Sequence, residues 1–464
     1  MPGDSRITVV GGGRMGLPLA CAFASRGAEV TVADVNAGLV ARIHAGACPY
    51  EEPELAALMR ELHVAGRLRA TTRTAEAAAG SDAIVVIVPA HLTAEREIDL
   101  ATLESASADV GRGLRPGTLV VYETTVTVGA TRRRLVPVLE ARSGLRAGRD
   151  FHVAYSPERV KANLVLQWLG TTPKVIGGLD DASRARATAF YARFLGAPVD
   201  DVGTLEAAEM TKLAGMLYRD VNIALANELA AFCELAGIDF ERVRVAANAD
   251  GEGSLLLAGI GVGGHCTPVY PYFLTREARR LGLPQRIAEA AREINDAQPG
   301  RHLERVAAGW RPLRGERVHL LGLGFRPGVK VDVLSPAYAL RDHLRRAGAH
   351  VTIEDPCYAD DELRRAGFVP GRAVDAALVV LNTAHPPFLA PDFAGWRRAG
   401  VEVVLDGRNA WRQQDVEAAG LLYFGVGRRP AEPLARNSGG DSGIRSRDLV
   451  PPGGEQRVAT DAQH

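Results

Sequence analysis

The chain has 464 residues, 47% of them hydrophobic and 24% charged, which is typical of a globular protein with a sizeable core. Basic and acidic residues number 55 each, so no charged face points to a nucleic acid, and apolar runs such as AIVVIVP are too short to span a membrane. The five scattered cysteines lack C-x-x-C spacing, which argues against disulfides and zinc and for reduced thiols in a cytoplasm. We therefore expect no metal, no nucleic-acid partner and no membrane segment, and the length predicts two or three domains.

Short apolar runs and helical patterns alternate over the first part of the chain, which runs into a strand without a signal-peptide pattern. Strands are expected at 7–10, 29–32, 83–88 and 118–121, and a helix at 17–25. Such alternation is typical of a parallel sheet with helices on both faces.

A glycine fingerprint, Gly11-x-Gly13-x-x-Gly16, follows the first expected strand and opens the first expected helix. In a dinucleotide site the first glycine allows a tight turn, the second lets a pyrophosphate approach, and the third lets the helix pack on the strand. Asp34 lies 18 residues beyond Gly16, at the end of the next strand, where a carboxylate would bind the adenosine ribose and repel a 2′-phosphate. The pattern favours NAD over NADP. The predicted cofactor contacts are Gly11, Gly13, Arg14, Met15, Gly16 and Asp34.

A long helical pattern runs from Leu205 to Gly237, with apolar residues three and four apart and a glycine at its expected end. This helix is longer than a small domain needs, so we expect it to link two domains and to carry a dimer interface. After Pro312 the alternation restarts, with strands expected at 318–324, 350–355, 377–382 and 401–407 and a helix at 337–347. From Asn437 onward the chain is rich in glycine, serine, proline and charge, which predicts a disordered tail.

The stretch GVGGHCTPVYPYFL (261–274) sets the thiol of Cys266 in a glycine-rich loop. A thiolate near an NAD site suggests aldehyde oxidation, in which the sulfur adds to the carbonyl, a hydride leaves to NAD and a thioester remains for water to cleave. A cysteine is also a small apolar residue that suits a turn, and the loop alone leaves both interpretations of Cys266 open. The other cysteines, expected to be inert, are Cys21, Cys48, Cys233 and Cys357.

A series of motifs extends from about Ile7 to Phe424, and these motifs are, in chain order, GGGRMGLPLA, ADVN, IHAGACPYEEPEL, YSPERVKAN, TTPKVIGG, AEMTKL, YRDVNIALANELA, GVGGHC, AREIND, GLGFRPG, SPA and LDGRN. Together they resemble the motifs of the UDP-glucose/GDP-mannose dehydrogenase family, the nucleotide-sugar 6-dehydrogenases. YSPERV, RDVNIALANELA and GGHC are most similar to the branch that acts on N-acetylated sugars, the UDP-N-acetylmannosamine dehydrogenase-like branch.

The resemblance implies an α/β fold of two Rossmann-like, doubly wound domains joined by a long central helix. The implied parts are an NAD-binding domain at 1–202, a central helical and dimerisation region with the cysteine loop at 203–300, a nucleotide-sugar-binding domain at 301–430 and a disordered tail at 431–464. The implied reaction is NAD-dependent oxidation of a nucleotide sugar at its C6 alcohol to the uronate, through a cysteine thiohemiacetal and thioester. A cytoplasmic homodimer serving polysaccharide or secondary-metabolite biosynthesis is the implied setting.

The resemblance also implies roles for individual residues. Cys266 matches the nucleophile, Lys212 the helix lysine that stabilises oxyanions, and Glu158 the glutamate that positions or activates the hydrolytic water. Thr125 matches a threonine that helps to bind water. The residues predicted to contact the substrate are Arg159, Arg219, Asn222, Gly261, Gly263, Arg326 and Arg408.

Two substitutions depart from the family pattern at the expected catalytic centre. Tyr270, four residues after the cysteine, stands where the family has an aspartate, and Met216, one helical turn after Lys212, where it has an asparagine. Methionine cannot donate a hydrogen bond, and tyrosine is uncharged at neutral pH. Further departures are Ala90 and His91 for a threonine–proline pair, and Lys330, Val331 and Val333 where two aspartates and an arginine are usual.

These departures leave alternatives to full oxidation open. One is a two-electron oxidation of a nucleotide sugar that stops at a carbonyl, and another is a non-catalytic NAD-binding homologue. A 3-hydroxyacid dehydrogenase would share the first domain, but it needs neither the cysteine loop nor the second domain. The sequence names neither the sugar nor the nucleotide.

Overall fold

The computed structural model describes residues 6–50, 52–93, 95–160 and 164–428, and the predicted disordered tail lies outside these residues. Its first sheet has eight strands in the order β10-β9-β8-β7-β4-β1-β2-β3. The strands are β1 (Arg6–Val10), β2 (Glu29–Ala33), β3 (Leu68–Thr71), β4 (Ala83–Val86), β7 (Leu119–Tyr122), β8 (His152–Tyr155), β9 (Lys174–Gly178) and β10 (Val199–Thr204).

From β3 to β8 this sheet has the Rossmann strand order. All of its neighbouring strands are parallel except β8 and β9. The order reverses between β1 and β4, and ligands of such sheets bind beyond the carboxyl ends of the strands at that point. A separate antiparallel hairpin of β5 (His91–Leu92) and β6 (Ile98–Asp99) follows β4.

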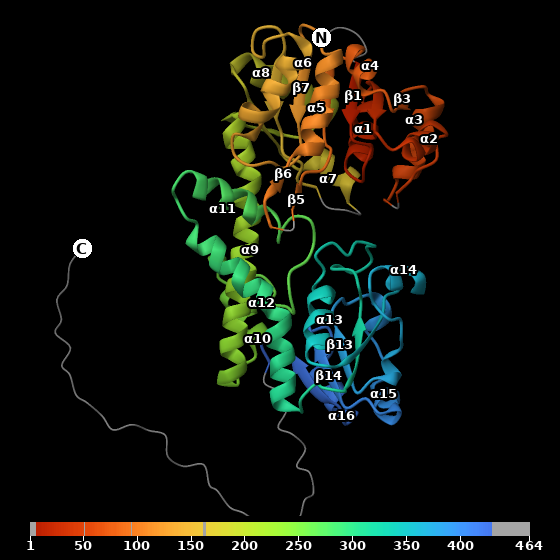
Figure 1. The fold of residues 1–464 in the computed structure, drawn as a ribbon, viewed down its shortest axis with the longest axis vertical. Helices are drawn as coiled ribbons and strands as arrows, with labels where there is room; N and C mark the ends of the chain where they lie inside the picture. Colours follow the sequence, from red (N-terminus) through yellow and green to blue (C-terminus); the bar gives the residue numbers. More distant parts are fainter. Residues whose placement is uncertain (1–5, 51, 94, 161–163, 429–464) are drawn as a thin grey trace, which may run out of the picture. The chain divides into compact units, whose positions relative to one another are not determined.

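Helices alternate with these strands, and Figure 1 colours them from red to yellow. They are α1 (Gly16–Ser25), α2 (Ala37–His44), α3 (Leu55–Val64), α4 (Thr74–Ala79), α5 (Ala101–Gly113), the π-helix η1 (Thr131–Leu135), α6 (Val136–Ser143), α7 (Val165–Thr171) and α8 (Asp181–Phe194). The strand AIVV of β4 is buried at every position, as expected for a parallel sheet covered on both faces.

The long predicted helix is α9 (Leu205–Ala236). It begins where the Thr204 hydroxyl accepts the N–H of Ala207, and it ends at Gly237, whose φ of 72° is the left-handed cap that glycine favours. The helices α10 (Phe240–Ala247), α11 (Tyr270–Arg280) and α12 (Arg286–Gly309) follow. Figure 1 shows α12 running beside α9, where a buried ion pair of Arg292 with Asp220 at 2.6 Å joins the two helices.

The second sheet is wholly parallel, in the order β12-β11-β13-β14-β15. Its strands are β11 (Arg317–Leu321), β12 (His350–Glu354), β13 (Leu378–Leu381), β14 (Val403–Asp406) and β15 (Leu422–Gly425). Its helices are α13 (Pro336–Arg346), α14 (Asp360–Arg365), η2 (Ala373–Asp375), η3 (Pro386–Phe388), α15 (Phe393–Ala399) and α16 (Gln413–Ala418). The strand order is the other common doubly wound order, with its reversal between β11 and β13.

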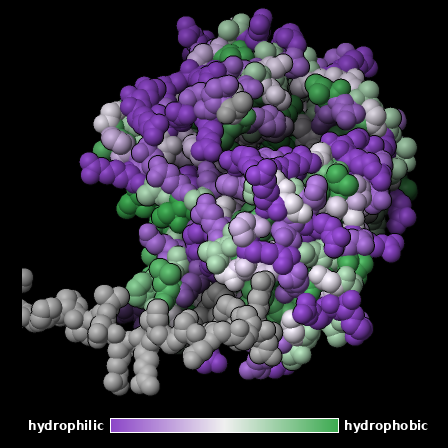
Figure 2. All heavy atoms as spheres, turned by 60° about the horizontal axis from the view of Figure 1, so that its bottom comes forward, coloured by the Kyte–Doolittle hydropathy of each residue, from purple (hydrophilic) through white to green (hydrophobic). Residues whose placement is uncertain are grey.

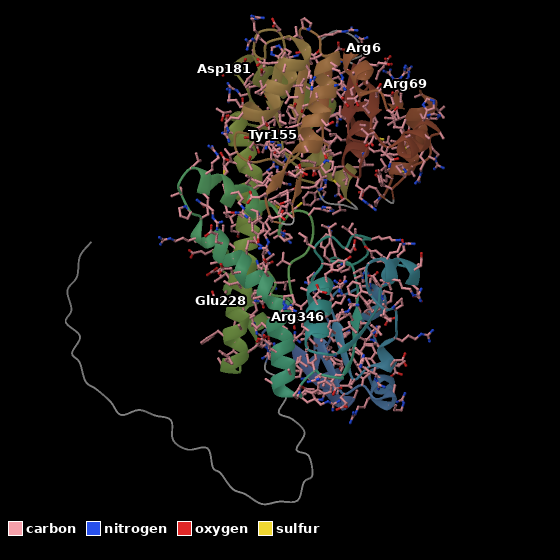
Figure 3. All side chains as sticks on the ribbon, viewed as in Figure 1. Arg6, Arg69, Tyr155, Asp181, Glu228 and Arg346 are labelled. Carbon is pink, nitrogen blue, oxygen red and sulfur yellow. The ribbon has the colours of Figure 1, made fainter. Side chains whose placement is uncertain are left out.

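The predicted α/β class, with two doubly wound sheets and a long helix, is confirmed. Apolar side chains fill the space between sheets and helices, and Tyr155, labelled in Figure 3, is among the largest fully buried residues. Figure 2 shows hydrophilic side chains over most of the face in view, with hydrophobic ones in small groups. Among the described residues, no helix is long and apolar enough to cross a membrane.

Candidate active site

The glycine turn after β1 has the shape that a dinucleotide requires. Gly11 has a φ of 106°, and a Cβ there would lie 3.1 Å from the backbone of Ile87. A Cβ on Gly16 would lie 1.9 Å from the Gly11 carbonyl oxygen, so α1 approaches β1 too closely for any larger residue. The exposed Gly13 is different, because no atom lies within 4 Å of an added Cβ. This turn thus leaves open backbone for a pyrophosphate, which fits NAD.

Asp34, at the end of β2, holds the turn with one oxygen. Its Oδ2 accepts the N–H of Gly12 at 2.7 Å, and its Oδ1 accepts the N–H of Asn36 at 2.9 Å. Tyr50, which sequence reasoning did not single out, donates to the Gly12 carbonyl at 3.1 Å, and the Arg14 guanidinium lies 5.5 Å from its ring centroid. Met15 is half-buried beside them. The structure thus brings the predicted cofactor residues together at one strand edge.

Cys266 lies in the loop that leads into α11, four residues before the helix begins at Tyr270. Its carbonyl oxygen accepts the N–H of Tyr270 at 2.9 Å and that of Val269 at 3.2 Å. The free amides and the dipole at a helix N-terminus favour a negative charge on a nearby sulfur. Cys266 is half-buried, whereas its neighbour His265 is exposed.

The loop before Cys266 is rich in glycine because it lies against the second sheet's loop. A Cβ on Gly263 would lie 2.6 Å from the Phe325 Cβ, and one on Gly261 would lie 2.9 Å from Pro336. Gly264, with a φ of 107°, donates its N–H to the Val333 carbonyl at 2.8 Å. The glycines predicted to contact substrate thus have a packing reason of their own, which fixes where Cys266 stands.

Lys212 and Glu158 meet although they lie far apart in the sequence. The buried Lys212 ammonium, on α9, donates to the main-chain carbonyl of Glu158 at 2.6 Å. Burial raises the pKa of the Glu158 carboxyl above its usual range, and the positive charge of Lys212 opposes this. A carboxyl group whose pKa is raised is a better proton acceptor near neutral pH.

Tyr270 connects these residues. The side chains of Cys266 and Thr125 both act on the pKa of its hydroxyl, and the Lys212 ammonium lies 5.9 Å from its ring centroid. Burial raises the pKa of Tyr270 most, the charge of Cys266 next. All four predicted catalytic residues therefore surround the residue that departs from the family pattern. Met216, the other departure, is half-buried one turn beyond Lys212.

A buried cluster that the sequence did not reveal supports the Glu158 loop. Glu123, just after β7, pairs with the Lys174 ammonium at 2.6 Å and accepts the Tyr191 hydroxyl at 2.6 Å. The Glu123 carbonyl accepts the N–H of Glu158 at 3.3 Å. These partners lie on three separate elements, and only the low lysine content of the chain, four in all, hints that Lys174 is special.

The other predicted substrate residues are dispersed. Asn222 is committed to the loop before the cysteine, since its amide nitrogen donates to the Ser254 carbonyl at 2.8 Å and its oxygen accepts the N–H of Leu256 at 2.8 Å. Arg159 donates to the Pro173 carbonyl. Arg219 is exposed on α9.

Arg326 and Arg408 follow β11 and β14, at the carboxyl edge of the second sheet where a ligand is expected. The Arg408 Nε donates to the Asn382 carbonyl at 2.6 Å, and burial lowers the pKa of Arg408 to about 10, which keeps it cationic at neutral pH. This edge therefore carries two cationic side chains, which suit a phosphate-bearing ligand.

One group near this edge has metal-ligand chemistry. Ligand atoms of Asp355, Cys357 and His385 lie within 4.8 Å of one another. The Asp355 Oδ2 accepts the N–H groups of Leu323 and Gly324 at 2.7 and 3.0 Å, and the His385 Nε2 lies 3.2 Å from it. These bonds explain the group as a support for the loop after β11, and the absence of a metal stays a prediction.

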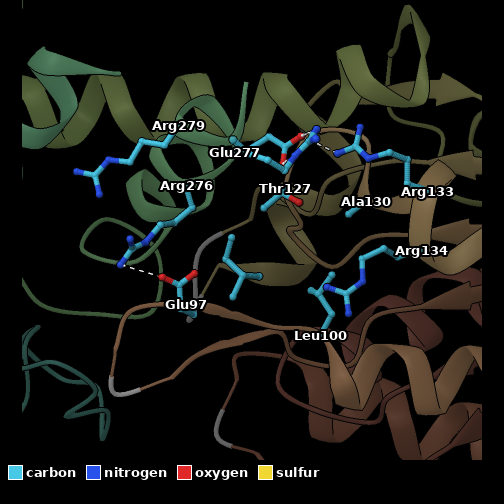
Figure 4. Close-up of a pocket in the computed structure, with 11 residues that line it drawn as sticks. Glu97, Leu100, Thr127, Ala130, Arg133, Arg134, Arg276, Glu277 and Arg279 are labelled. Carbon is cyan, nitrogen blue, oxygen red and sulfur yellow. Dashed lines mark hydrogen bonds and ion pairs between the residues drawn. The ribbon is translucent and has the colours of Figure 1, made fainter. Parts of the chain in front are cut away.

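A separate pocket of about 590 Å³ contains none of the candidate catalytic residues (Figure 4). Its five arginines are each paired with a glutamate, for example Arg133 with Glu277 at 2.7 Å and Arg276 with Glu97 at 3.1 Å. Because each of these arginines already has a carboxylate partner, we assign no ligand to this pocket.

Comparison with known proteins identifies the family. Three domains described for the UDP-glucose/GDP-mannose dehydrogenase family match the chain: the NAD binding domain at 5–195, the central domain at 206–297 and the UDP binding domain at 319–413. The UDP-N-acetyl-D-mannosamine dehydrogenase of Pyrococcus horikoshii is 32% identical over 437 residues, 91% of this chain and 99% of the relative. The NDP-N-acetyl-D-galactosaminuronic acid dehydrogenase of Ralstonia solanacearum is 33% identical over 428 residues, 89% of this chain and 97% of the relative.

A solved structure agrees with these relatives. That of the Pyrococcus horikoshii UDP-D-ManNAc dehydrogenase superposes with a TM-score of 0.83 at 30% identity, over 91% of this chain and 99% of that one. The predicted use of NAD is thus confirmed by the matching NAD binding domain. The chain belongs to the UDP-glucose/GDP-mannose dehydrogenase family and is an NAD-dependent nucleotide-sugar dehydrogenase.

Proposed function

We propose that the enzyme oxidises the C6 alcohol of a nucleotide sugar to the uronate, with Cys266 as the covalent nucleophile. The observation that carries the proposal is the meeting of Cys266, Thr125, Lys212 and Glu158 around Tyr270. These residues come from the loop before α11, the loop after β7, the helix α9 and the loop after β8. Such a group of a thiol, a buried cation and a carboxyl with a raised pKa suits acyl chemistry.

In the first oxidation the alcohol loses a proton and a hydride and becomes an aldehyde; NAD, when bound, supplies the hydride acceptor in both oxidations. Cys266 then attacks the aldehyde carbon, and the carbonyl electron pair moves to the oxygen. The Lys212 ammonium has two N–H groups left after its bond to the Glu158 carbonyl, and these stabilise the oxyanion of the thiohemiacetal. Loss of a second hydride leaves a thioester on the sulfur.

Glu158 serves the last step. Its carboxylate takes a proton from a water that attacks the thioester carbon, and the carbon–sulfur bond then breaks to release the uronate and the Cys266 thiolate. The raised pKa of Glu158 suits this role, since the base must be strong enough to accept the proton. Thr125, whose side chain acts on the pKa of the same Tyr270 hydroxyl as Cys266 does, helps to hold the water.

The substrate we propose is a nucleotide carrying an N-acetylated hexose. The relatives named above act on UDP-N-acetyl-D-mannosamine or are named for N-acetyl-D-galactosaminuronic acid, and their matches span nearly their whole lengths. The nucleotide would bind at the carboxyl edge of the second sheet, where Arg326 and Arg408 lie and where the UDP binding domain matches.

A second candidate is a two-electron oxidation that releases a carbonyl product. It is favoured by Tyr270 and Met216, because the second half of the reaction depends on thiolate and oxyanion support that these residues change. Under this alternative Cys266 takes no part in turnover.

We further propose a cytoplasmic homodimer that joins through α9. Large apolar side chains on this helix are exposed at a spacing that places most of them on one face, and they are Met210, Tyr218, Leu225, Leu229, Phe232 and Leu235. An exposed apolar stripe of this kind is typical of an interface between subunits.

The test is the number of NADH formed per sugar consumed, run to completion on UDP-, GDP- and dTDP-linked sugars with and without an N-acetyl group. Two NADH per sugar are expected from the wild type. Cys266→Ser is expected to form at most one and to accumulate an aldehyde that hydrazine traps. One NADH per sugar from the wild type, with Cys266→Ser unchanged, would establish the two-electron alternative instead.

A further inference from the structure

Tyr50 lies in the loop between α2 and α3, yet its side chain reaches the glycine turn after β1. Its hydroxyl donates to the Gly12 carbonyl at 3.1 Å, while the Gly12 N–H donates to the Asp34 carboxylate at 2.7 Å. Both backbone groups of Gly12 are therefore bonded to side chains from other elements. The peptide that precedes the exposed Gly13 is thus held in one orientation.

The loop that carries Tyr50 is itself tied to α2. The Arg42 guanidinium donates to the Cys48 carbonyl at 2.9 Å, and the Cys48 thiol donates to the Tyr50 carbonyl at 3.2 Å. The half-buried Tyr50 packs against the apolar core of the first sheet, as Met15 does. Burial and the charge of Asp34 raise the pKa of the phenol, so the hydroxyl keeps its proton at neutral pH and remains a donor.

Arg14 supplies an exposed cation at the same turn. Its guanidinium carbon lies 5.5 Å from the Tyr50 ring centroid, which is within the range of an attractive cation–π contact. A long surface side chain loses conformational entropy when a ligand fixes it, and a ring that already holds the side chain reduces this cost. Tyr50 thus keeps a positive charge next to Gly13, whose open backbone suits a pyrophosphate.

We propose that Tyr50 is a positioning residue for the pyrophosphate of the cofactor: its hydroxyl fixes the Gly12 peptide and its ring holds the Arg14 guanidinium, so both are in place before a dinucleotide binds. Tyr50 acts through these two residues and not on the reacting atoms. The inference depends on the use of NAD and is independent of the proposed role of Cys266.

The two contacts of Tyr50 can be removed separately. Tyr50→Phe loses the hydroxyl and keeps the ring, whereas Tyr50→Leu loses both. The matched control is Tyr272→Leu, because the Tyr272 hydroxyl accepts a hydrogen bond from Arg96 and the Arg96 guanidinium lies 5.0 Å from the Tyr272 ring centroid, away from the glycine turn. This control removes the same kind of tyrosine–arginine contact from α11.

The first test measures binding and not turnover. Dissociation constants of the full chain are measured for ADP-ribose, which carries the pyrophosphate, by calorimetry, and for adenosine, which carries none, by saturation-transfer nuclear magnetic resonance. Tyr50→Phe is expected to weaken ADP-ribose binding about threefold to tenfold, and Tyr50→Leu about tenfold or more. Adenosine binding should stay unchanged in both variants, and Tyr272→Leu should bind both ligands as the wild type does.

Unchanged ADP-ribose binding in Tyr50→Leu would overturn the proposal. An equal loss of ADP-ribose and adenosine binding would overturn it as well, since a general distortion of the first domain would then explain the effect.

A double-mutant cycle tests whether the ring acts through Arg14. Arg14→Met removes the cation, so in that background Tyr50→Leu is expected to weaken ADP-ribose binding only as much as Tyr50→Phe does in the wild type. The full effect of Tyr50→Leu in the Arg14→Met background would contradict the part given to the ring.

Steady-state kinetics give a second readout. Contacts that bind the cofactor equally in the ground state and the transition state change KM and leave kcat unchanged. Tyr50→Leu is therefore expected to raise the KM for NAD about tenfold with kcat within twofold of the wild type, and a lowered kcat at an unchanged KM would contradict the positioning role. ADP-ribose binding needs no sugar substrate, so failure of the proposed oxidation to the uronate would leave the binding test intact.

Discussion

The ammonium nitrogen of Lys212 lies 2.6 Å from the main-chain carbonyl oxygen of Glu158, across a sequence separation of 54 residues. This bond ties the central helix to the loop after β8, and it fixes the cation before any substrate oxygen arrives. A preorganised cation of this kind costs no reorganisation when the oxyanion forms.

Replacement of Lys212 by methionine is therefore expected to lower kcat by about a hundred- to a thousandfold, the usual result of losing one oxyanion donor. Steady-state NADH formation measures this. The control is Thr211→Ala on the same helix, whose hydroxyl donates to the Ala207 carbonyl at 2.9 Å. Retention of more than a tenth of the wild-type kcat in Lys212→Met would contradict the role given to the ammonium.

The acid limb of the pH profile should report on Glu158. Burial raises its pKa above the ordinary 4.5, and the carboxylate must be unprotonated to accept a proton from water. The rates of the second oxidation and of thioester hydrolysis are thus expected to fall as the pH drops through the raised pKa of Glu158. The rate of the first oxidation should show no such fall. Glu158→Gln should lose the limb together with most of the hydrolysis. A limb that persists in the variant would assign the titration to another group.

The negative charge of Asp34, at the end of β2, should determine whether the enzyme prefers NAD or NADP. Asp34→Asn keeps an oxygen for the Gly12 N–H but removes the negative charge that would face a 2′-phosphate. The ratio of kcat/KM for NADP to that for NAD is expected to rise about tenfold or more, which corresponds to about 1.4 kcal/mol. Asp82→Asn, at an exposed ion pair with Arg6, is the control and should leave the ratio unchanged. An unchanged ratio in Asp34→Asn would show that another residue determines the preference for NAD over NADP.

The sequence predicted the parts that depend on local pattern. The glycine turn, the parallel strands and α9 between Thr204 and Gly237 all follow from spacing, capping and glycine conformation. Resemblance supplied Cys266, Lys212 and Glu158, which are far apart in the chain and share no local pattern. The pair of Glu123 with Lys174 was missed because its partners lie 51 residues apart on separate elements.

The position of Tyr270 in space is a second feature that the sequence could not give. In the sequence Tyr270 marked only a departure from the family, whereas the fold brings its ring within 5.9 Å of the Lys212 ammonium. Apolar spacing on α9 likewise predicted a helix, but it could not tell core positions such as Leu213 from exposed ones such as Phe232.

A buried carboxyl on α9 should make stability depend on pH. Glu209 caps η1 through the N–H groups of Gly129 and Thr131, and burial raises its pKa to about 7. Because the pKa of Glu209 is higher in the folded chain than in the unfolded one, the folded state is stabilised when this carboxyl is protonated. Its contribution to the free energy of unfolding is therefore fully present below about pH 4.5 and is lost as the pH rises through about 7. The free energy of unfolding of the wild type relative to Glu209→Gln is therefore expected to fall by up to about 3 kcal/mol across this window.

Urea unfolding at a series of pH values measures this difference. Glu206→Gln is the matched control one turn earlier, where the Arg132 bond lowers the pKa of the carboxyl, so its contribution has the opposite sign and is lost as the pH falls. Parallel curves for the wild type and Glu209→Gln would show that the Glu209 carboxyl titrates as it does in the unfolded chain.

The exposed apolar face of α9 should determine the assembly state. Phe232 is 65% exposed on this helix, which is a poor position for a phenyl ring in a monomer. If α9 joins two copies, Phe232→Asp buries a charge against an apolar partner and is expected to weaken the dimer by at least about a hundredfold, that is about 2.7 kcal/mol. Sedimentation equilibrium over a concentration series measures the dissociation constant.

Val64→Asp is the matched control, because Val64 is 87% exposed at the end of α3, on an element of the first sheet's domain. It receives the same charge at an even more exposed apolar site and should leave the dissociation constant unchanged. The circular dichroism spectrum of both variants should match the wild type, which separates dissociation from unfolding. A wild-type chain that sediments as a monomer at every concentration, or a Phe232→Asp chain that dimerises like Val64→Asp, would remove α9 as the interface and leave its apolar stripe without a partner copy.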